Sequence, residues 1–151
     1  MTTDNPHMGT EDNKALLRRF FDEVLNTGNL ALADQLLDPG YQFHFPALPQ
    51  PGGPEVFKDT LLAFRQGFPD LNFTIEDMIA EGDRVAVRFT VRGTHRGDFQ
   101  GVPPTGRPVQ FSGISIYRVA GGKMVEDRSE IDQVSLMQQL GLMPGPEQAP
   151  R

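Results

Sequence analysis

The sequence predicts an α+β domain: a cone-shaped, curved antiparallel sheet wrapped around three N-terminal helices and enclosing a pocket. Two observations support this fold class. The first half of the chain carries apolar residues at the i, i+3, i+4 spacing of amphipathic helices, and the second half carries long runs of alternating apolar and polar residues. Helices followed by a run of strands are typical of α+β proteins. Such a sheet is expected to curl around the helices and leave one end of the cone open.

The helices are expected in the first half of the chain. The first begins at Asp12. Its apolar stripe consists of Leu16, Leu17, Phe20, Phe21, Val24 and Leu25. Gly28 is a candidate C-cap, and Asn29 can cap a short second helix that runs through Leu37. A third helix is expected to begin near Pro54, because proline is favoured in the first turn of a helix.

Five stretches are expected to form strands. "YQFHF" (41–45) is a short strand, and "LNFTIEDMIAEGDRVAVRFTVRG" (71–93) predicts two strands joined by a hairpin turn at "EGD". "PVQFSGISIYRV" and "MVEDRSEID" predict two more, and a short last helix is expected at 133–140. "FSGISIY" carries apolar residues on both faces, of which the helices cover one. A homodimer or a larger oligomer such as a tetramer is therefore expected.

The composition is that of one globular domain. We expect this domain at residues 12–141, between a flexible arm at 1–11 and a loose tail at 142–151. The net charge is −6 and no Lys/Arg cluster interrupts the acidity, so neither nucleic acid nor an anionic membrane is an expected partner. No apolar stretch approaches the roughly 20 residues of a membrane span. With no cysteine and no signal-peptide pattern, a cytoplasmic protein is expected.

Metal binding is not expected. His7, His44 and His95 show neither HxH nor HExxH spacing, and there are no cysteine ligands. The glycine-rich stretch "GTHRGDFQGVPPTGRP" (93–108) matches neither GxGxxG nor GxxxxGK[ST], so it is interpreted as a long ordered loop. His95 lies in this loop, where a solvent-exposed position is favoured over a place in a site.

Two carboxylates near the end of the last strand are candidates for chemistry. Glu130 and Asp132 lie two residues apart, so in a strand they share one face, and Ile131 points the other way. Arg128 has the same parity and can pair with either carboxylate. His44 alternates with phenylalanines on the early strand, where it is either a partly buried histidine or a polar group facing a pocket. The residues alone leave open whether the carboxylates face solvent or a pocket.

The order of these motifs resembles the SnoaL-like polyketide cyclases, a family in the superfamily named after nuclear transport factor two. The resemblance rests on "FFDEVLNTGN", "YQFHFP", "FPDL…GDRVAVR…GTHRG…PPTGR" and "GGKMVEDRSEIDQVSLMQQLG", and it covers Asn13–Gly141. It implies a deep apolar pocket, usually in an oligomer, and an enzyme that uses neither metal nor cofactor. The substrate it implies is a small hydrophobic carbonyl compound, whose ring closes by an intramolecular aldol condensation.

The resemblance also implies roles for individual residues. Asp132 matches the aspartate that acts as general acid and base at the end of the last strand. His44 and His95 match histidines of the "Y…H" and "GTH" motifs, and they are expected in the substrate pocket with Glu130 and Arg128. Arg128 stands where the family often has a bulky aromatic residue, so a more polar pocket is expected. Burial and a neighbouring Glu130 would raise the pKa of Asp132, whereas Arg128 would lower it.

Other functions remain open. Paired carboxylates at Glu130 and Asp132 would also suit an epoxide hydrolase or an epoxide-opening cyclase, and the superfamily also includes isomerases of the ketosteroid type. A function of another class is a non-catalytic, dimeric module that binds a small molecule.

Overall fold

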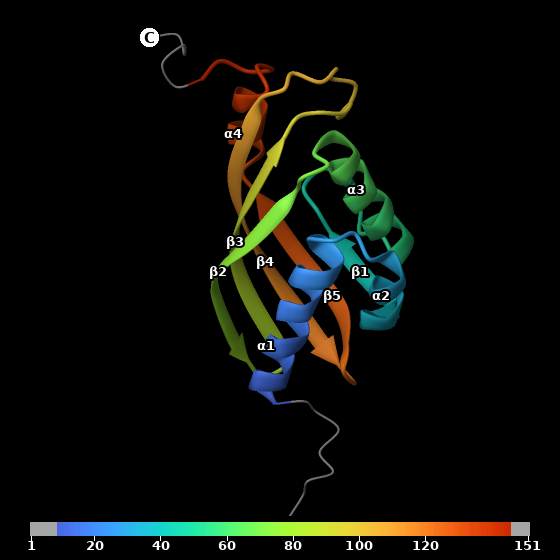
Figure 1. Ribbon diagram of the computed structural model, residues 1–151. Helices are drawn as coiled ribbons and strands as arrows, with labels where there is room; N and C mark the ends of the chain where they lie inside the picture. Colours follow the sequence, from blue (N-terminus) through green and yellow to red (C-terminus); the bar gives the residue numbers. More distant parts are fainter. Residues whose placement is uncertain (1–8, 146–151) are drawn as a thin grey trace, which may run out of the picture.

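One sheet and a layer of helices make up the part of the chain that the computed structural model describes, residues 9–145 (Figure 1). The strands are β1 (Leu37–His44), β2 (Asn72–Glu81), β3 (Arg84–Thr94), β4 (Pro108–Ala120) and β5 (Lys123–Ile131). The helices are α1 (Thr10–Arg19), η1 (Phe20–Leu25), α2 (Leu30–Leu36), α3 (Pro54–Gly67) and α4 (Gln133–Gln139). The strand order is β1-β5-β4-β3-β2, and the predicted α+β class is confirmed.

The first helix begins earlier than predicted. α1 starts at Thr10, two residues before the predicted domain start, and continues into the π-helical segment η1. Phe20 and Phe21, neighbours in η1, are both buried. Segments of π-helix are frequent at functional sites. For the predicted arm and tail, residues 1–8 and 146–151 lie outside the described residues.

The caps of the next two helices agree with the sequence. Asn29 caps α2, because its side chain accepts a hydrogen bond of 3.0 Å from the backbone N–H of Leu32. α2 ends one residue earlier than predicted, since Leu37 already belongs to β1. α3 begins at Pro54 as predicted, and it buries Phe57 on the side facing the sheet. Between residues 9 and 145, no helix has the length and apolar character needed to cross a membrane.

The pairing of the strands is mixed. β2, β3, β4 and β5 form consecutive antiparallel pairs, and the predicted hairpin turn contains Gly82 with φ 59°. Gly121 and Gly122, with φ 60° and 75°, make the turn between β4 and β5. β1 pairs with β5 in parallel, so the prediction of a wholly antiparallel sheet is wrong at this pair. Strands joined by a short turn must pair antiparallel, but β1 and β5 are far apart in the chain, so either direction of pairing is possible for them.

The helices α1 to α3 lie on one side of the sheet, and α4 lies at the end where β4 begins (Figure 1). Burial alternates along β3 and β4 as the predicted period of 2 requires. Val85, Val87, Phe89 and Val91 of β3 point toward the helices and are buried. The core therefore sits between the helices and this face of the sheet, which we call the inner face.

A β-bulge in β5 sets which of its side chains reach the inner face. Tyr117 pairs with Asp127, but Val119 pairs with Met124, so Val125 is an extra residue in β5. Met124 and Asp127 are both buried, although they are three residues apart. One extra residue moves every following side chain to the opposite face of a sheet. Beyond Val125, the odd-numbered residues of β5 therefore face inward.

The inner face also requires a glycine at position 113. A Cβ added there would lie 2.6 Å from Cζ of Phe89 and 2.7 Å from the carbonyl oxygen of Glu130. We predict that Gly113→Ala lowers the free energy of unfolding by about 1–3 kcal/mol, because the backbone of β5 cannot give way easily. Urea denaturation measures this, with Ser112→Ala on the exposed face as the control. Equal stability of the two variants would contradict the close approach.

Candidate active site

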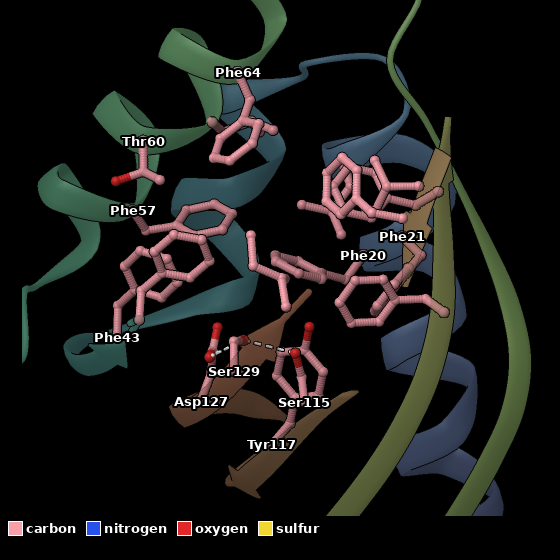
Figure 2. A pocket seen from close by; sticks show the side chains of 18 residues that line it. Phe20, Phe21, Phe43, Phe57, Thr60, Phe64, Ser115, Tyr117, Asp127 and Ser129 are labelled. Atoms are coloured by element: carbon pink, nitrogen blue, oxygen red, sulfur yellow. Dashed lines mark hydrogen bonds between the residues drawn. The ribbon is translucent and has the colours of Figure 1, made fainter. Parts of the chain in front are cut away.

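An aromatic cavity lies between the helices and the inner face of the sheet (Figure 2). Phenylalanines from both layers form most of its wall, among them Phe20, Phe21, Phe43, Phe57, Phe64 and Phe89. Its polar lining residues are Thr60, Ser115, Tyr117, Asp127 and Ser129. Four of these five come from β4 and β5, so the polar groups gather on the sheet side, opposite the phenylalanines of α3. The open space measures about 70 Å³, well below the roughly 300–1,000 Å³ typical of ligand pockets.

Asp127 is the one carboxylate in the lining of this cavity, and it is 2% exposed. Its Oδ2 accepts a hydrogen bond of 2.6 Å from the phenol of Tyr41, and its Oδ1 accepts one of 2.7 Å from Ser129. Ser129 lies 2.6 Å from the hydroxyl of Ser115. A chain of four hydrogen-bonded side chains therefore runs from behind the sheet-side wall into the cavity.

Asp127 holds its proton more tightly in this cavity wall than an aspartic acid side chain does in water. Burial raises the pKa of Asp127 to about 7, although the hydrogen bonds from Tyr41 and Ser129 lower it. The charge of Glu126 raises it further. Burial and the charge of Asp127 also raise the pKa values of Tyr41 and Tyr117, so both phenols stay neutral and can donate hydrogen bonds. A carboxyl group with a pKa near 7 can both take up and release a proton at neutral pH.

Asp132 does not face this cavity, and the prediction that it points inward is wrong. It follows β5 directly, is exposed, and caps α4 by accepting a hydrogen bond of 3.0 Å from the backbone N–H of Ser135. The bulge at Val125 explains the difference. Counted from buried Met124 without a bulge, position 132 would face inward, and with the bulge Asp127 takes that side. The acid/base role that the family resemblance implies for Asp132 remains a prediction.

His44, Arg128 and Glu130 lie together, but on the outer face of the sheet. They line a shallow depression with Ile114 and Ile116, and none of the three is in the lining of the aromatic cavity, although Phe45 and Ser129 border both hollows. Their predicted place in one cavity with Asp132 and the phenylalanines of the helices is therefore wrong. The same bulge turns Arg128 and Glu130 outward.

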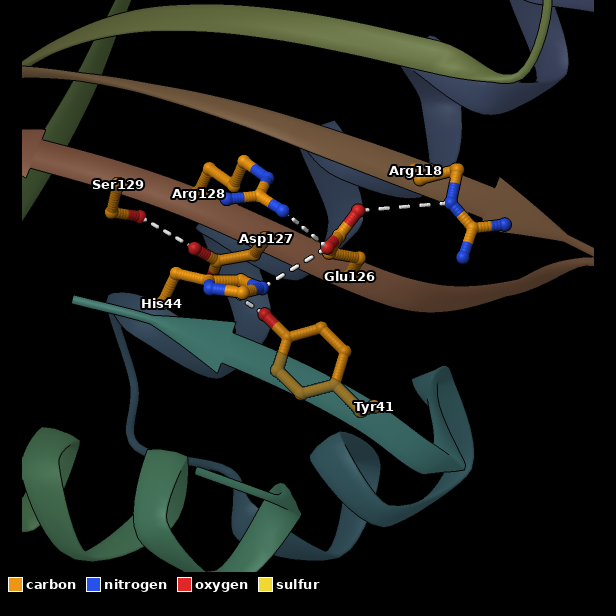
Figure 3. A network of polar contacts seen from close by, with 7 residues as sticks. All are labelled: Tyr41, His44, Arg118, Glu126, Asp127, Arg128 and Ser129. Carbon is orange, nitrogen blue, oxygen red and sulfur yellow. Dashed lines mark hydrogen bonds and ion pairs between the residues drawn. The ribbon is translucent and has the colours of Figure 1, made fainter. Parts of the chain in front are cut away.

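Glu126 is the centre of an ion-pair network on this outer face (Figure 3). Its carboxylate lies 3.0 Å from Nε2 of His44, 3.2 Å from the Arg128 guanidinium and 3.8 Å from that of Arg118. Asp127, the next residue, points to the inner face. Two consecutive carboxylates thus occupy opposite environments: Glu126 lies beside a histidine and two arginines, and Asp127 lies beside tyrosine side chains.

His95 is neither exposed nor in the aromatic cavity. It is 0% exposed, and its Nδ1 accepts a hydrogen bond of 3.2 Å from the backbone N–H of Thr105. Its ring packs against Phe68 at a centroid distance of 5.5 Å. The loop 95–107 folds back over the end of α3, which buries the histidine, so both the predicted exposure and the predicted pocket position are wrong.

The sequence reasoning missed Asp127, Ser129, Ser115 and Tyr41. Tyr41 belongs to the same "Y…H" motif that pointed to His44, but it lies on the opposite face of β1. The available signal was the parity of Tyr41 with the apolar Phe43, both of which are buried. Within residues 9–145, no group of three or more histidines and carboxylates is arranged to hold a metal ion.

Comparison with known proteins gives the family. Residues 15–140 match the sequence model of the SnoaL family, the SnoaL-like polyketide cyclases. The chain belongs to this family. Among the similar proteins is the aklanonic acid methyl ester cyclase DauD of Streptomyces sp. (strain C5), which is 30% identical over 132 residues, covering 83% of this chain and 80% of DauD.

Several solved structures have the same fold as this chain. AclR of Streptomyces galilaeus, a candidate hydroxylase, has a TM-score of 0.83 at 28% identity, with 95% of this chain and 87% of that chain covered. IdmH of Streptomyces antibioticus, a candidate polyketide cyclase, has a TM-score of 0.78 at 31% identity, with 85% of this chain and 98% of that chain covered. One of these proteins is a candidate hydroxylase and the other a candidate cyclase, so the same fold is used for different chemistries and the site must decide the function.

The raised pKa of Asp127 makes stability depend on pH. Between about pH 4 and pH 7 the folded protein binds more protons at this carboxyl than the unfolded chain does, so this group's contribution to stability falls as the pH rises. We predict that Asp127→Asn becomes more stable relative to wild type by on the order of 2 kcal/mol between pH 5 and pH 8. Urea denaturation of both proteins at the two pH values measures this. A constant difference between them would show that the carboxyl titrates alike in both states.

Proposed function

We propose that this protein is a polyketide cyclase that closes a ring by intramolecular aldol condensation, with Asp127 as general acid and base. The observation that carries the proposal is the single buried carboxyl group, with a pKa near 7, in the polar wall of an aromatic cavity. The aklanonic acid methyl ester cyclases among the relatives support a polyketide ester as the substrate class. The phenylalanine walls suit its flat apolar body, and the polar groups of β4 and β5 suit its carbonyl groups.

The proposed steps use only groups of the chain and the substrate. A carbon flanked by two carbonyls gives its proton to the Asp127 carboxylate, and the electron pair of the C–H bond forms an enolate. The hydroxyl groups of Tyr117 and Ser115 line the cavity beside Asp127 and donate hydrogen bonds to the enolate oxygen. The enolate carbon then attacks a second carbonyl of the same molecule and forms the new C–C bond. Asp127 returns the proton to the resulting alkoxide, which restores its carboxylate.

The cavity contributes by holding the substrate in a folded conformation. Bringing two carbons of one chain together can lower the barrier by roughly 7–11 kcal/mol. In its present shape the cavity has room for only a few atoms, so aromatic side chains such as Phe57 and Phe64 of α3 must move when a substrate enters. These side chains are the wall opposite Asp127 (Figure 2).

The paired-carboxylate chemistry of an epoxide hydrolase is less well supported. Asp127 has no second carboxylate beside it in the cavity lining, and Glu130 and Asp132 lie outside that lining. The isomerase alternative needs only one acid/base group, so it shares the proposed site and differs in the substrate. Turnover of a substrate decides between these enzymes and a non-catalytic binding module.

The activity test compares Asp127 with Asp132, the aspartate to which the family resemblance assigns the acid/base role. We predict that Asp127→Asn lowers kcat for cyclisation of a β-keto ester polyketide mimic by about 10²–10⁴-fold, the usual share of general acid–base catalysis. Asp132→Asn is the matched control, because asparagine caps a helix as well as aspartate does. It is expected to keep nearly the wild-type rate. Thermal melting of both variants checks that they fold.

Each other result has a definite meaning. If Asp132→Asn loses the activity and Asp127→Asn keeps it, the role implied by the family resemblance is correct and the proposal for Asp127 is wrong. If wild type turns over neither the mimic nor an isomerisable ketone, and yet binds them, the binding-module function is correct.

We also propose that two copies of the chain pair through the outer face of the sheet. Ile114 and Ile116 are 50% and 44% exposed there. Arg88 and Glu130 flank Ile114 on its two neighbouring strands. A two-fold axis that lies between two facing sheets and runs along β4 at Ile114 would bring Arg88 of one copy close to Glu130 of the other. The face would then be complementary to itself in charge and apolar at its centre.

The dimer is tested at its apolar centre. We predict that Ile116→Lys converts a dimer into a monomer at micromolar concentration, because it places two like charges in the middle of the interface. Leu62→Lys is the matched control, since Leu62 is 48% exposed on α3, on the opposite side of the sheet from the proposed interface. Light scattering measures the mass. A monomeric wild type would refute the proposed dimer.

A further inference from the structure

We infer that Tyr41 is a positioning residue for Asp127. From behind the cavity wall it donates a hydrogen bond to one carboxylate oxygen of Asp127, so that the other oxygen exchanges protons with the substrate. This inference rests on the proposed role of Asp127. It assigns Tyr41 no contact with the substrate.

The geometry places Tyr41 behind Asp127. β1 runs beside β5, and Phe43 pairs with Asp127, so Tyr41 lies one inward-facing position earlier on the neighbouring strand. Its phenol donates a hydrogen bond of 2.6 Å to Oδ2, and the side chain is 1% exposed (Figure 3). Tyr41 is not part of the cavity lining. The ring of Phe57, at a centroid distance of 6.2 Å and nearly perpendicular, packs against the Tyr41 ring.

The two oxygens of the carboxylate are therefore not equivalent. Oδ2 faces a buried donor that no substrate in the cavity can displace. Oδ1 accepts from Ser129, which lines the cavity and contacts the Ser115 hydroxyl. Ser129 can turn its hydroxyl toward Ser115 or toward a ligand, and this frees Oδ1. The substrate proton is thus expected to reach Oδ1, while Tyr41 keeps the carboxyl group from rotating.

The same hydrogen bond sets the proton affinity of the carboxyl group. A donor to a carboxylate stabilises the charged form, and the hydrogen bond from Tyr41 is the strongest influence that lowers the pKa of Asp127 against the effect of burial. The other groups that act on Asp127 are Ser129 on its own strand, Glu126 beside it and Tyr117 on β4. Glu126 points to the outer face, where His44, Arg118 and Arg128 surround it. Tyr41→Phe removes the donor and leaves the ring and the other groups in place.

The test measures the carboxyl group directly and not only through activity. The protein is labelled with ¹³C at the aspartate carboxyl groups, and the Asp127 signal is identified by its loss in Asp127→Asn. We expect Tyr41→Phe to raise the pKa of Asp127 by about one unit, since hydrogen bonds to charged groups are among the strong ones. The acidic limb of the kcat/KM profile should move to higher pH by the same amount.

A control separates positioning from stability. Leu36→Val removes one methylene group from the buried core at a residue outside the cavity lining, so it should lower the melting temperature without moving the pKa of Asp127. If Tyr41→Phe behaves like Leu36→Val, Tyr41 is only structural and the inference is wrong. If the pKa of Asp127 rises but the kcat/KM profile stays, Tyr41 does hold the carboxyl group and the proposed catalytic role of Asp127 is wrong.

Discussion

The structure of the site depends on one extra residue in the last strand. Val125 is bulged out of the pairing between β4 and β5, and it reverses the faces of all the residues that follow it in β5. Without the bulge, Arg128 and Glu130 would point into the aromatic cavity and Asp127 would point to solvent. Because of the bulge, Asp127 is the one ionisable carboxyl group in the cavity lining, and the charged side chains of Arg128 and Glu130 lie on the outer face.

The sequence was sufficient for the elements whose signals are local. The cap at Asn29, the start of α3 at Pro54 and the hairpin at Gly82 each follow from the chemistry of a few neighbouring residues. The face of β5 was not predictable in this way, because "MVEDRSEID" carries carboxylates at both parities and period 2 assumes an unbroken ladder. The parallel pairing of β1 was missed for a related reason, since it joins segments far apart in the chain.

The proton affinity of Asp127 results from two large and opposed effects. Removal from water favours the neutral acid, and the hydrogen bonds from Tyr41 and Ser129 favour the anion. Either effect alone would place the titration far from neutrality. Their balance requires both donors and a cavity that excludes bulk water, which the phenylalanines of η1 and α3 provide. The packing of the phenylalanine rings in the core therefore helps to set the pKa of Asp127.

The parallel contact between β1 and β5 has a consequence for biosynthesis. Tyr41 and Asp127 are 86 residues apart, so their hydrogen bond cannot form on the ribosome until nearly the whole domain has emerged. Contacts of such long range close late, because the loop entropy must first be offset by the pairing of β2 through β5. Until β5 has emerged, a nascent chain therefore carries a formed hairpin of β2 and β3 and an unfinished site, and the edge of β5 then stays open to other strands until β1 pairs with it. Loss of β1 from its place would expose this edge in the mature protein too, so the segment that completes the site also guards the sheet against aggregation.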